Sequence, residues 1–347
     1  MTRKSAWLCG AWWLLGVVCL AYGGEKKAEP PKKPQFCAID EESAGPDFKV
    51  QGEYVGEVTG ADGAKQKLGA QIIACGSGTF HSAFFPGGLP GDGWDGKMKL
   101  EKTPAKQGNI PVDTKTDGDK TVVDGVYKAT IAGGVMTGET DKKEKFELKK
   151  VVRKSPTLEL KPPPGAIVLF DGTNTDEWNK KNHMDSRKLL KCGGLTVRKF
   201  QDYTLHVELC LPFKPESRGQ ERGNSGVYMQ NRYECQVLDS FGLAGDNNEC
   251  GGIYTLAAPK VNMCFPPLSW QTYDFEFEAA KYEADGKTKT KLAVVTLKHN
   301  GVVVHDKLEL KKSTGGGIPE TSAPGPIQFQ DHGNPVFYRN VWIVEKK

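Results

Sequence analysis

The sequence of 347 residues has no Cys-x-x-Cys pair, no block of basic residues and no three-residue glycine repeat. The first absence leaves a zinc ribbon without support. The second argues against a nucleic-acid partner, because such proteins concentrate positive charge on one face. Since the 41 glycines and 21 prolines do not form a collagen repeat, they favour the dense turns of β architecture. Hydrophobic residues make up 38% of the chain, which can fill two cores.

Long apolar runs are also missing after the N-terminus. There, Arg3 and Lys4 precede an apolar stretch over 6–20 that ends in small residues. These are the parts of a secretory signal peptide, which we predict over 1–23. The stretch is short for a membrane anchor, which needs about 20 apolar residues, and the residues before Cys19 do not suit lipoprotein processing. We therefore expect export to the periplasm or the exterior, without an integral membrane segment after cleavage.

Nine cysteines are present, and two of them lie in the expected signal peptide. The number left is odd, so at least one stays free or pairs between chains. Cys250 and Cys264 flank a glycine-rich apolar segment. They either form a disulfide there or remain small buried thiols.

Composition divides the rest of the chain into segments. Residues 24–44 are rich in lysine and proline and are expected to form a tether. Short strand-like runs over 45–157, separated by turn formers, predict a small all-β domain of unknown role. A Pro-Pro-Pro-Gly break at 162–165 marks the boundary to a second domain over 165–347.

The second domain is again rich in short strands without intervening helical periodicity. This pattern predicts an all-β, two-sheet sandwich or jelly roll. Asn300-Gly301 lies between two alternating runs, which predicts a hairpin with a two-residue turn.

Three of these strands carry long polar side chains on the face away from their apolar residues. Alternation places Glu234 and Gln236 on the face opposite Cys235 and Val237. The side chains expected on such polar faces are Tyr228, Gln230, Glu234, Gln236, Gln328, Gln330 and His332. Neutral donors and acceptors with an aromatic ring suit a concave surface that binds sugar hydroxyls. A plain solvated face is the alternative.

The strand Glu234-x-Gln236-x-x-Asp239 is similar to the E-x-D-x-x-E strand of laminarinase-type glucanases, which are concanavalin-like sandwiches. A regular strand turns Asp239 to the core, but one bulge would return it to the face of Glu234. Two carboxylates on one face would suit glycoside hydrolysis. Glutamine replaces the middle aspartate of that motif, and aspartate replaces its last glutamate.

An ordered set of short motifs resembles a known family over residues 165–345. The motifs are Phe170-Asp-Gly-Thr173, Gly223-Asn-Ser-Gly-Val-Tyr228, Tyr233-Glu-Cys-Gln-Val-Leu-Asp239, Gly252-Ile-Tyr254, Trp270, Gly325-Pro-Ile-Gln-Phe-Gln-Asp-His-Gly333 and Phe337-Tyr-Arg-Asn-Val341. The family is the 3-keto-disaccharide hydrolase domain, also described as 3-keto-glucoside 1,2-lyase/2-hydroxy-glucal hydratase. The resemblance implies a concanavalin-like jelly roll and action on oxidised sugars.

Such chemistry needs a base, because a ketone at C3 acidifies the proton on C2. Loss of that proton lets the C1 substituent leave, and water then adds, so the net result is hydrolysis. We predict Glu234 and His332 as the acid and base. Asp239 would accept a sugar hydroxyl or ligate a divalent cation that polarises the ketone. No other cofactor is expected.

The remaining predicted residues would bind an oligosaccharide or 3-keto-glycoside substrate. Gln236, Gln328 and Gln330 would hold hydroxyls, and Tyr228 or Tyr254 would stack on the ring. Asn224 belongs to the same group, and Arg222 either reaches the enolate or is a solvated loop residue. A non-catalytic glycan-binding module and a laminarinase-like hydrolase are the alternative functions.

Overall fold

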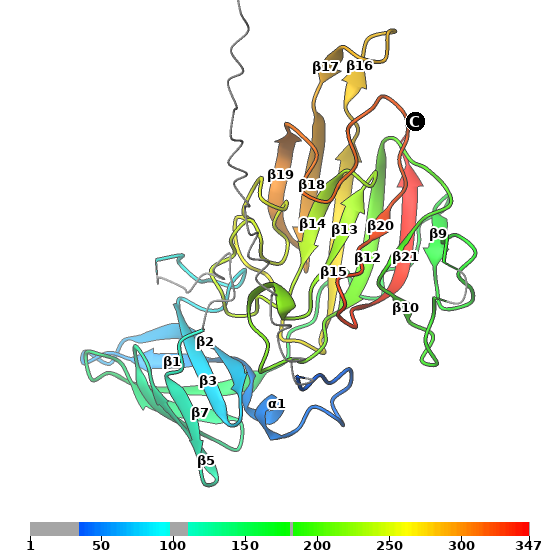
Figure 1. Cartoon of the computed structure of the whole chain (residues 1–347). Coiled ribbons are helices and arrows are strands. Elements are labelled where there is room, and N and C mark those ends of the chain that lie inside the picture. The colour runs from blue at the N-terminus through cyan, green and yellow to red at the C-terminus, as the bar shows by residue number, and fades with distance from the viewer. Residues whose placement is uncertain (1–34, 98–109, 181–182, 347) are drawn as a thin grey trace, which may run out of the picture. The chain divides into compact units, whose positions relative to one another are not determined.

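The computed structural model describes residues 35–97, 110–180 and 183–346 (Figure 1). The predicted signal peptide over 1–23 and the first part of the predicted tether over 24–44 lie outside these residues, so export stays a prediction. Nearly all regular structure in the described part is antiparallel strand. The all-β prediction is therefore confirmed. No helix in these ranges is long and apolar enough to cross a bilayer.

The first eight strands form a closed barrel, in which β8 pairs back to β1. The bounds are α1 Pro46–Val50, β1 Gly52–Thr59, β2 Lys65–Gly76, β3 Thr79–Pro86, β4 Thr114–Asp117, β5 Lys120–Asp124, β6 Lys128–Ala132, β7 Val135–Glu139 and β8 Lys145–Val151. Tyr54, Phe80 and Phe146 are among the buried side chains that fill its interior. The barrel lies within the range predicted as a separate domain, whose boundaries stay a prediction.

The following strands form a seven-stranded and a four-stranded sheet. The larger sheet has the order β10-β21-β12-β15-β18-β19, with β9 also paired to β21, and the smaller has the order β11-β20-β13-β14. The bounds are β9 Ile167–Phe170, β10 Leu190–Lys191, β11 Gly194–Leu195, β12 Tyr203–Cys210, η1 Gly219–Glu221, β13 Ser225–Met229, β14 Tyr233–Val237, β15 Trp270–Glu278, β16 Lys281–Tyr282, β17 Lys289–Lys291, β18 Ala293–His299, β19 Val302–Leu310, β20 Gln328–Phe329 and β21 Phe337–Glu345. Strands β16 and β17 pair with each other.

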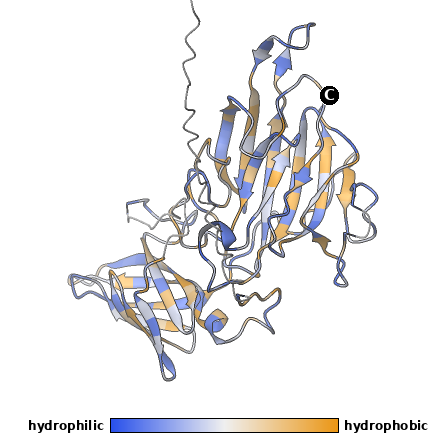
Figure 2. Cartoon of the chain, viewed as in Figure 1, coloured by the Kyte–Doolittle hydropathy of each residue, from blue (hydrophilic) through white to orange (hydrophobic). Residues whose placement is uncertain are grey.

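Both sheets contribute alternate residues to one core. Val227 and Phe329 enter it from the smaller sheet, and Phe275 and Val295 enter it from the larger. Bands of hydrophobic and hydrophilic residues along the strands follow this alternation (Figure 2). The result is a β-sandwich, whose jelly-roll connectivity stays a prediction.

Local turn chemistry agrees with the sequence at the β18–β19 hairpin. Asn300 and Gly301 have φ angles of 49° and 80°, and His299 pairs with Val302. Both positive values suit the two-residue turn predicted there.

Two other predictions concern packing. Ala38 and Phe213 exchange two backbone hydrogen bonds of 3.0 and 2.9 Å, so the described end of the expected tether is folded. Cys250 and Cys264 are both buried, free thiols that form no disulfide. Of the two alternatives for this pair, the structure shows the thiols.

Candidate functional site

The four-stranded sheet brings together three of the predicted polar side chains. Tyr228 on β13 lies opposite Glu234 on β14 and opposite Gln328 on β20. Their neighbours Val227 and Phe329 belong to the core. Because side chains alternate along a strand, a tyrosine, an acid and an amide share the face turned away from the core.

The next position on this face of β13 is Gly226, opposite Gln236. A Cβ atom at Gly226 would lie only 2.5 Å from Oε1 of Glu234. On the other side, the Gln330 N–H donates to the Gly226 carbonyl at 2.9 Å. Because Gly226 has no side chain, it leaves room for the carboxyl group of Glu234 between Gln236 and Gln330.

The Tyr228 hydroxyl is the centre of a hydrogen-bonded group. It lies 2.8 Å from Oε2 of Glu234 and 3.2 Å from the Gly315 carbonyl, and it accepts from Nε2 of Gln330 at 3.1 Å. A hydroxyl has one hydrogen, so it donates to one of the two acceptors at a time. Tyr228 thus connects Glu234 to the amide of Gln330 and to the loop that contains Gly315.

The electrostatics of Glu234 suit proton transfer near neutral pH. The residue is 2% exposed, and burial raises the pKa of its carboxyl to about 7, although the Tyr228 hydrogen bond lowers it. Burial and the neighbouring carboxylate raise the pKa of Tyr228 well above its ordinary value. Tyr228 therefore stays a hydrogen-bond donor, while Glu234 can take up or release a proton.

Gln220 is a member of this site that sequence reasoning missed. It lies in η1, and its Oε1 accepts from Nε2 of Gln236 at 3.0 Å and from Nδ2 of Asn224 at 3.1 Å. Its own Nε2 donates to the Asn248 carbonyl at 3.0 Å. Alternation along strands could not reveal Gln220, because it comes from a turn.

Several amide oxygens of the site have no protein donor. Oδ1 of Asn224 and the Oε1 atoms of Gln328 and Gln330 are buried and accept no hydrogen bond from any described residue. A buried acceptor without a donor is costly. Three such oxygens suit a ligand that supplies several hydroxyl donors.

A glycine-rich loop, Thr314–Gly317, lies against the acid and the tyrosine and was also missed. Oγ1 of Thr314 accepts from the Glu234 backbone N–H at 2.8 Å. A Cβ atom at Gly316 would lie 2.8 Å from the Tyr228 hydroxyl. The run of three glycines is the sequence signal, and Gly316 is the position where a side chain would collide with the site.

The two tyrosines predicted to stack on a sugar ring differ in exposure. Tyr228 is 1% exposed, so neither face of its ring is free for stacking. Tyr254 is partly exposed, and its backbone N–H donates to the Glu234 carbonyl at 3.0 Å. Of the pair, Tyr254 is the aromatic residue that could contact a sugar.

Asp239 and Arg222 are both predicted to contact the substrate, and the structure pairs them with each other. Strand β14 ends at Val237, before Asp239, so its pairing with β13 does not test the bulge predicted there. Asp239 is 2% exposed, and its Oδ2 accepts from Nε of Arg222 at 2.7 Å while its Oδ1 accepts from the Phe241 N–H. Burial raises the pKa of Asp239, and Arg222 opposes this effect. Asp239 and Arg222 therefore bind each other. No group of three or more His, Cys, Asp or Glu side chains in the described ranges is placed to hold a metal.

His332 also differs from its expected position. Strand β20 ends at Phe329, so the alternation that placed His332 beside Glu234 does not continue that far. His332 is exposed, and no described contact joins its side chain to Glu234 or Tyr228. Asp331 accepts from the Gly333 N–H at 3.0 Å, which makes it a turn residue.

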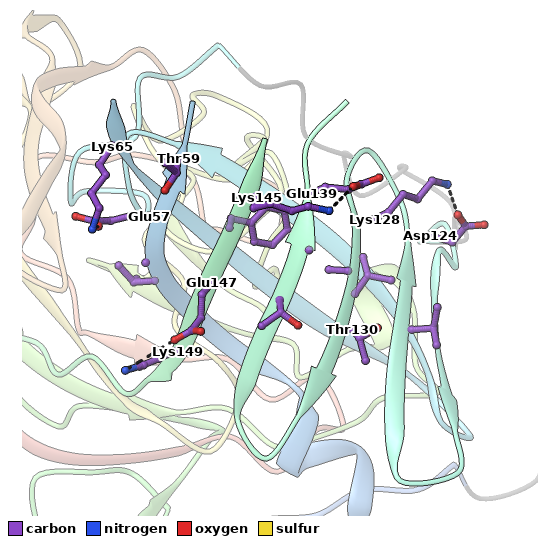
Figure 3. Close-up of a pocket in the computed structure, with 18 residues that line it drawn as sticks. Glu57, Thr59, Lys65, Asp124, Lys128, Thr130, Glu139, Lys145, Glu147 and Lys149 are labelled. Carbon is purple, nitrogen blue, oxygen red and sulfur yellow. Dashed lines mark hydrogen bonds and ion pairs between the residues drawn. The ribbon is translucent and has the colours of Figure 1, made fainter. Parts of the chain in front are cut away.

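A large hollow of 1130 Å³ lies on the outer face of the barrel (Figure 3). Its charged side chains pair with each other: Lys145 with Glu139 at 2.7 Å and Lys65 with Glu57 at 2.9 Å. This hollow therefore presents no excess of one charge, and we assign it no ligand.

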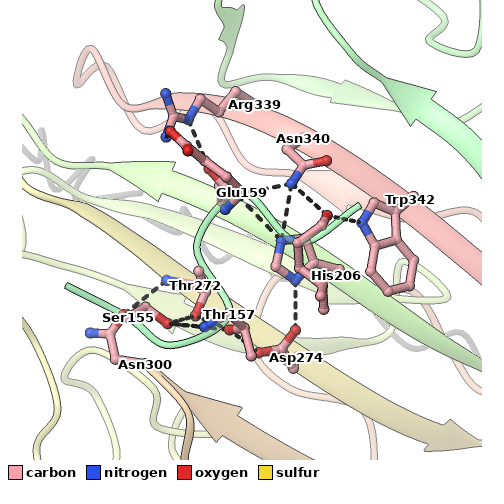
Figure 4. Close-up of polar contacts among 12 residues, drawn as sticks. Ser155, Thr157, Glu159, His206, Thr272, Asp274, Asn300, Arg339, Asn340 and Trp342 are labelled. Carbon is pink, nitrogen blue, oxygen red and sulfur yellow. Dashed lines mark hydrogen bonds and ion pairs between the residues drawn. The ribbon is translucent and has the colours of Figure 1, made fainter. Parts of the chain in front are cut away.

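A second polar cluster lies on the outer face of the seven-stranded sheet (Figure 4). Nδ1 of His206 lies 2.6 Å from Oδ1 of Asp274, and the Thr157 hydroxyl donates to the other oxygen of Asp274 at 2.7 Å. Burial opposes charge on His206, but Asp274 and Glu208 outweigh it and raise its pKa. This cluster attaches the segment after the barrel to the sheet.

These features define a β-sandwich protein whose polar sheet face suits hydroxyl-rich ligands. Residues 165–344 match the family model of the 3-keto-alpha-glucoside-1,2-lyase-like domain. The match covers more than half of the chain, and the chain belongs to this family. Membership confirms the resemblance found in the sequence and places the protein among carbohydrate-active proteins. No curated protein matches the chain.

Three crystal structures of proteins from Parabacteroides distasonis ATCC 8503, each described as a proposed glycosyl hydrolase, are similar to part of the chain. One is 31% identical and covers 53% of this chain and 85% of its own, with a TM-score of 0.49. The others are 19% and 17% identical, cover 53% and 52% of this chain and 94% and 99% of their own, and have TM-scores of 0.37 and 0.36. Since all three scores are below 0.5, family membership rests on the matched model.

Proposed function

We propose that this protein is an enzyme that cleaves 3-keto-glycosides, with Glu234 as its base. The observation that carries this proposal is a buried carboxyl group with a pKa of about 7, hydrogen-bonded to Tyr228 at 2.8 Å. Glu234 stands on a sheet face otherwise made of amides and tyrosine, which suits a neutral, hydroxylated substrate.

In the first half of the reaction, the Glu234 carboxylate removes the proton from C2 of the sugar. The electron pair of that C–H bond forms an enolate with the C3 ketone. The C1–O bond then breaks, a C1=C2 double bond forms, and the departing oxygen takes a proton, which the protonated Glu234 can supply.

In the second half, water adds across the double bond. The hydroxide part joins C1 and a proton returns to C2, so the two halves sum to hydrolysis. Glu234 is again ionised after the first half and can accept the proton of the attacking water. One acid–base group with a pKa near 7 suits both halves.

The unpaired amide oxygens would hold the sugar during these steps. Asn224, Gln328 and Gln330 each offer a buried acceptor to a sugar hydroxyl. The Tyr228 hydroxyl is a donor that can turn toward the enolate oxygen once Glu234 is protonated and no longer needs it.

A laminarinase-like mechanism is less compatible with this geometry. It needs two carboxyl groups that flank the scissile bond. Asp239, the second carboxylate of the sequence motif, lies in a buried ion pair with Arg222. An elimination that needs one base fits the arrangement better.

The test compares a nitrophenyl glucoside with its 3-keto form, using wild type, Glu234→Gln and Glu309→Gln. Glu309 is an exposed glutamate on β19 and is the matched control. We expect wild type and the control to consume only the 3-keto form. Loss of a general base should lower kcat by about 100-fold or more, with sugar affinity changed only a few-fold.

Two outcomes would contradict the proposal. If wild type binds the 3-keto sugar but never consumes it, with or without divalent metal, the protein is a glycan-binding module. If Glu234→Gln retains full turnover, the base is a different residue.

A further inference from the structure

Strand β2 of the barrel is shared between two cores. Ile72 and Ala74 pack in the barrel interior, whereas Ile73 and Cys75 belong to the core cluster of the sandwich. Neighbouring side chains on a strand point to opposite faces, so one strand can serve both cores. A Cβ atom at Gly242 would lie 2.4 Å from Cδ1 of Ile73, which shows how closely β2 approaches the segment after β14.

Two arginines beside the candidate site bind the backbone at the end of β2. Nη2 of Arg218 donates to the Cys75 carbonyl at 2.8 Å, and Nη1 of Arg222 donates to the Ala74 carbonyl at 3.0 Å. Arg218 also donates through Nη1 to the Pro215 and Ser217 carbonyls of its own loop, at 2.6 and 2.8 Å. Its planar guanidinium therefore joins this loop to the barrel.

The η1 turn, Gly219–Glu221, lies between these two arginines. From it, Gln220 accepts hydrogen bonds from Gln236 and Asn224, which stand on the polar face. The same short segment thus makes contacts in two directions: its arginines hold the barrel, and its glutamine holds two site residues.

We propose that the barrel is a positioning element of the site, and that the end of β2 acts through Arg218 and η1 on Gln220. Without this support, the Gln220 side chain would regain rotamer freedom, and Gln236 and Asn224 would lose a fixed acceptor. Displacement of substrate-holding groups by even 1 Å can cost about 100-fold in rate. The kinetic part of this proposal rests on the proposed function.

The test is a double-mutant cycle with Arg218→Gln and Gln220→Ala in the full chain. If Arg218 acts through Gln220, each single variant should raise KM for the 3-keto-glycoside by about tenfold, and the double variant should be no worse than Gln220→Ala. Arg218→Lys should restore part of the loss, because lysine can donate to the Cys75 carbonyl. Arg198→Gln is the control, since Arg198 pairs with Glu177 at 2.9 Å and is largely exposed.

A second measurement needs no turnover. In wild type, the side-chain amide signals of Gln236 and Asn224 in nuclear magnetic resonance should each be a single sharp pair. They should broaden or shift in Arg218→Gln and remain unchanged in Arg198→Gln. Unchanged amide signals, or additive KM effects in the cycle, would overturn the positioning role, whereas an inactive wild type with the expected amide changes would overturn only the proposed function.

Discussion

Replacing Glu234 with glutamine should make the protein more stable at alkaline pH, although it removes the proposed base. Glu234 is 2% exposed, and its pKa is raised by burial from 4.5 to about 7. A carboxyl group whose pKa is higher in the folded than in the unfolded protein makes its full contribution to stability at pH values below its unfolded pKa. This contribution is lost as the pH rises through the folded value. The window for Glu234 therefore runs from 4.5 to about 7.

The magnitude follows from the two pKa values. Each unit of difference corresponds to about 1.4 kcal/mol, so between about pH 5 and about pH 8 the wild type should lose about 2 to 3 kcal/mol of unfolding free energy through Glu234. Glutamine does not ionise, so the variant lacks this loss. Other titrating groups occur in both chains and cancel in the comparison.

Urea unfolding of wild type, Glu234→Gln and Glu309→Gln at about pH 5 and about pH 8 measures the difference directly. Glu309→Gln should follow wild type, because Glu309 is exposed. An equal loss of stability in wild type and Glu234→Gln would show that Glu234 does not ionise in a buried site, and the case for it as a base near neutral pH would fail.

Three further predictions concern the same structure. The kcat/KM of wild type should rise with pH to a plateau with its midpoint near 7, since the base must be ionised. Tyr228→Phe should move this midpoint upward, because the Tyr228 hydrogen bond lowers the pKa of Glu234. A midpoint that does not move in Tyr228→Phe would contradict this link. Gly226→Ala should reduce turnover by about 100-fold because its Cβ would lie 2.5 Å from Oε1 of Glu234. Gly194→Ala in the same sheet meets its nearest atom at 3.5 Å and should retain activity, so equal losses in the two variants would contradict the steric reason. His206 has a raised pKa, so its ion pairs should stabilise the fold at low pH and weaken as the pH rises through that value. His206→Gln should therefore lose most stability in acid, and a loss that is the same at all pH values in denaturant titrations would count against those ion pairs.

Local sequence patterns predicted much of the sandwich because they act over short distances. The Asn300-Gly301 turn and the alternation that puts Tyr228 and Glu234 on one face both follow from backbone geometry within a few residues. Alternation gave the wrong result where regular pairing stopped. It could not be extended to His332, because β20 ends at Phe329.

The pairing of Arg222 with Asp239 was not predicted, for a different reason. Each residue type was compatible with a sugar site, but the two form a buried ion pair at 2.7 Å. The Arg222 guanidinium also binds the Ala74 carbonyl, which is 148 residues away in the sequence. No local pattern carries information about such a distant partner.

The amino-acid sequence alone determined that this protein is built from strands, to which family it belongs and which sheet face is polar, because these properties depend on composition, motifs and a two-residue period. Only the tertiary structure decided that Glu234 is buried beside Tyr228 with a pKa near 7, that Gln220 and the loop Thr314–Gly317 join the site, and that β2 serves two cores. Burial and hydrogen-bond partners arise from segments far apart in the chain, and both the chemistry of an acid and the position of an amide depend on them.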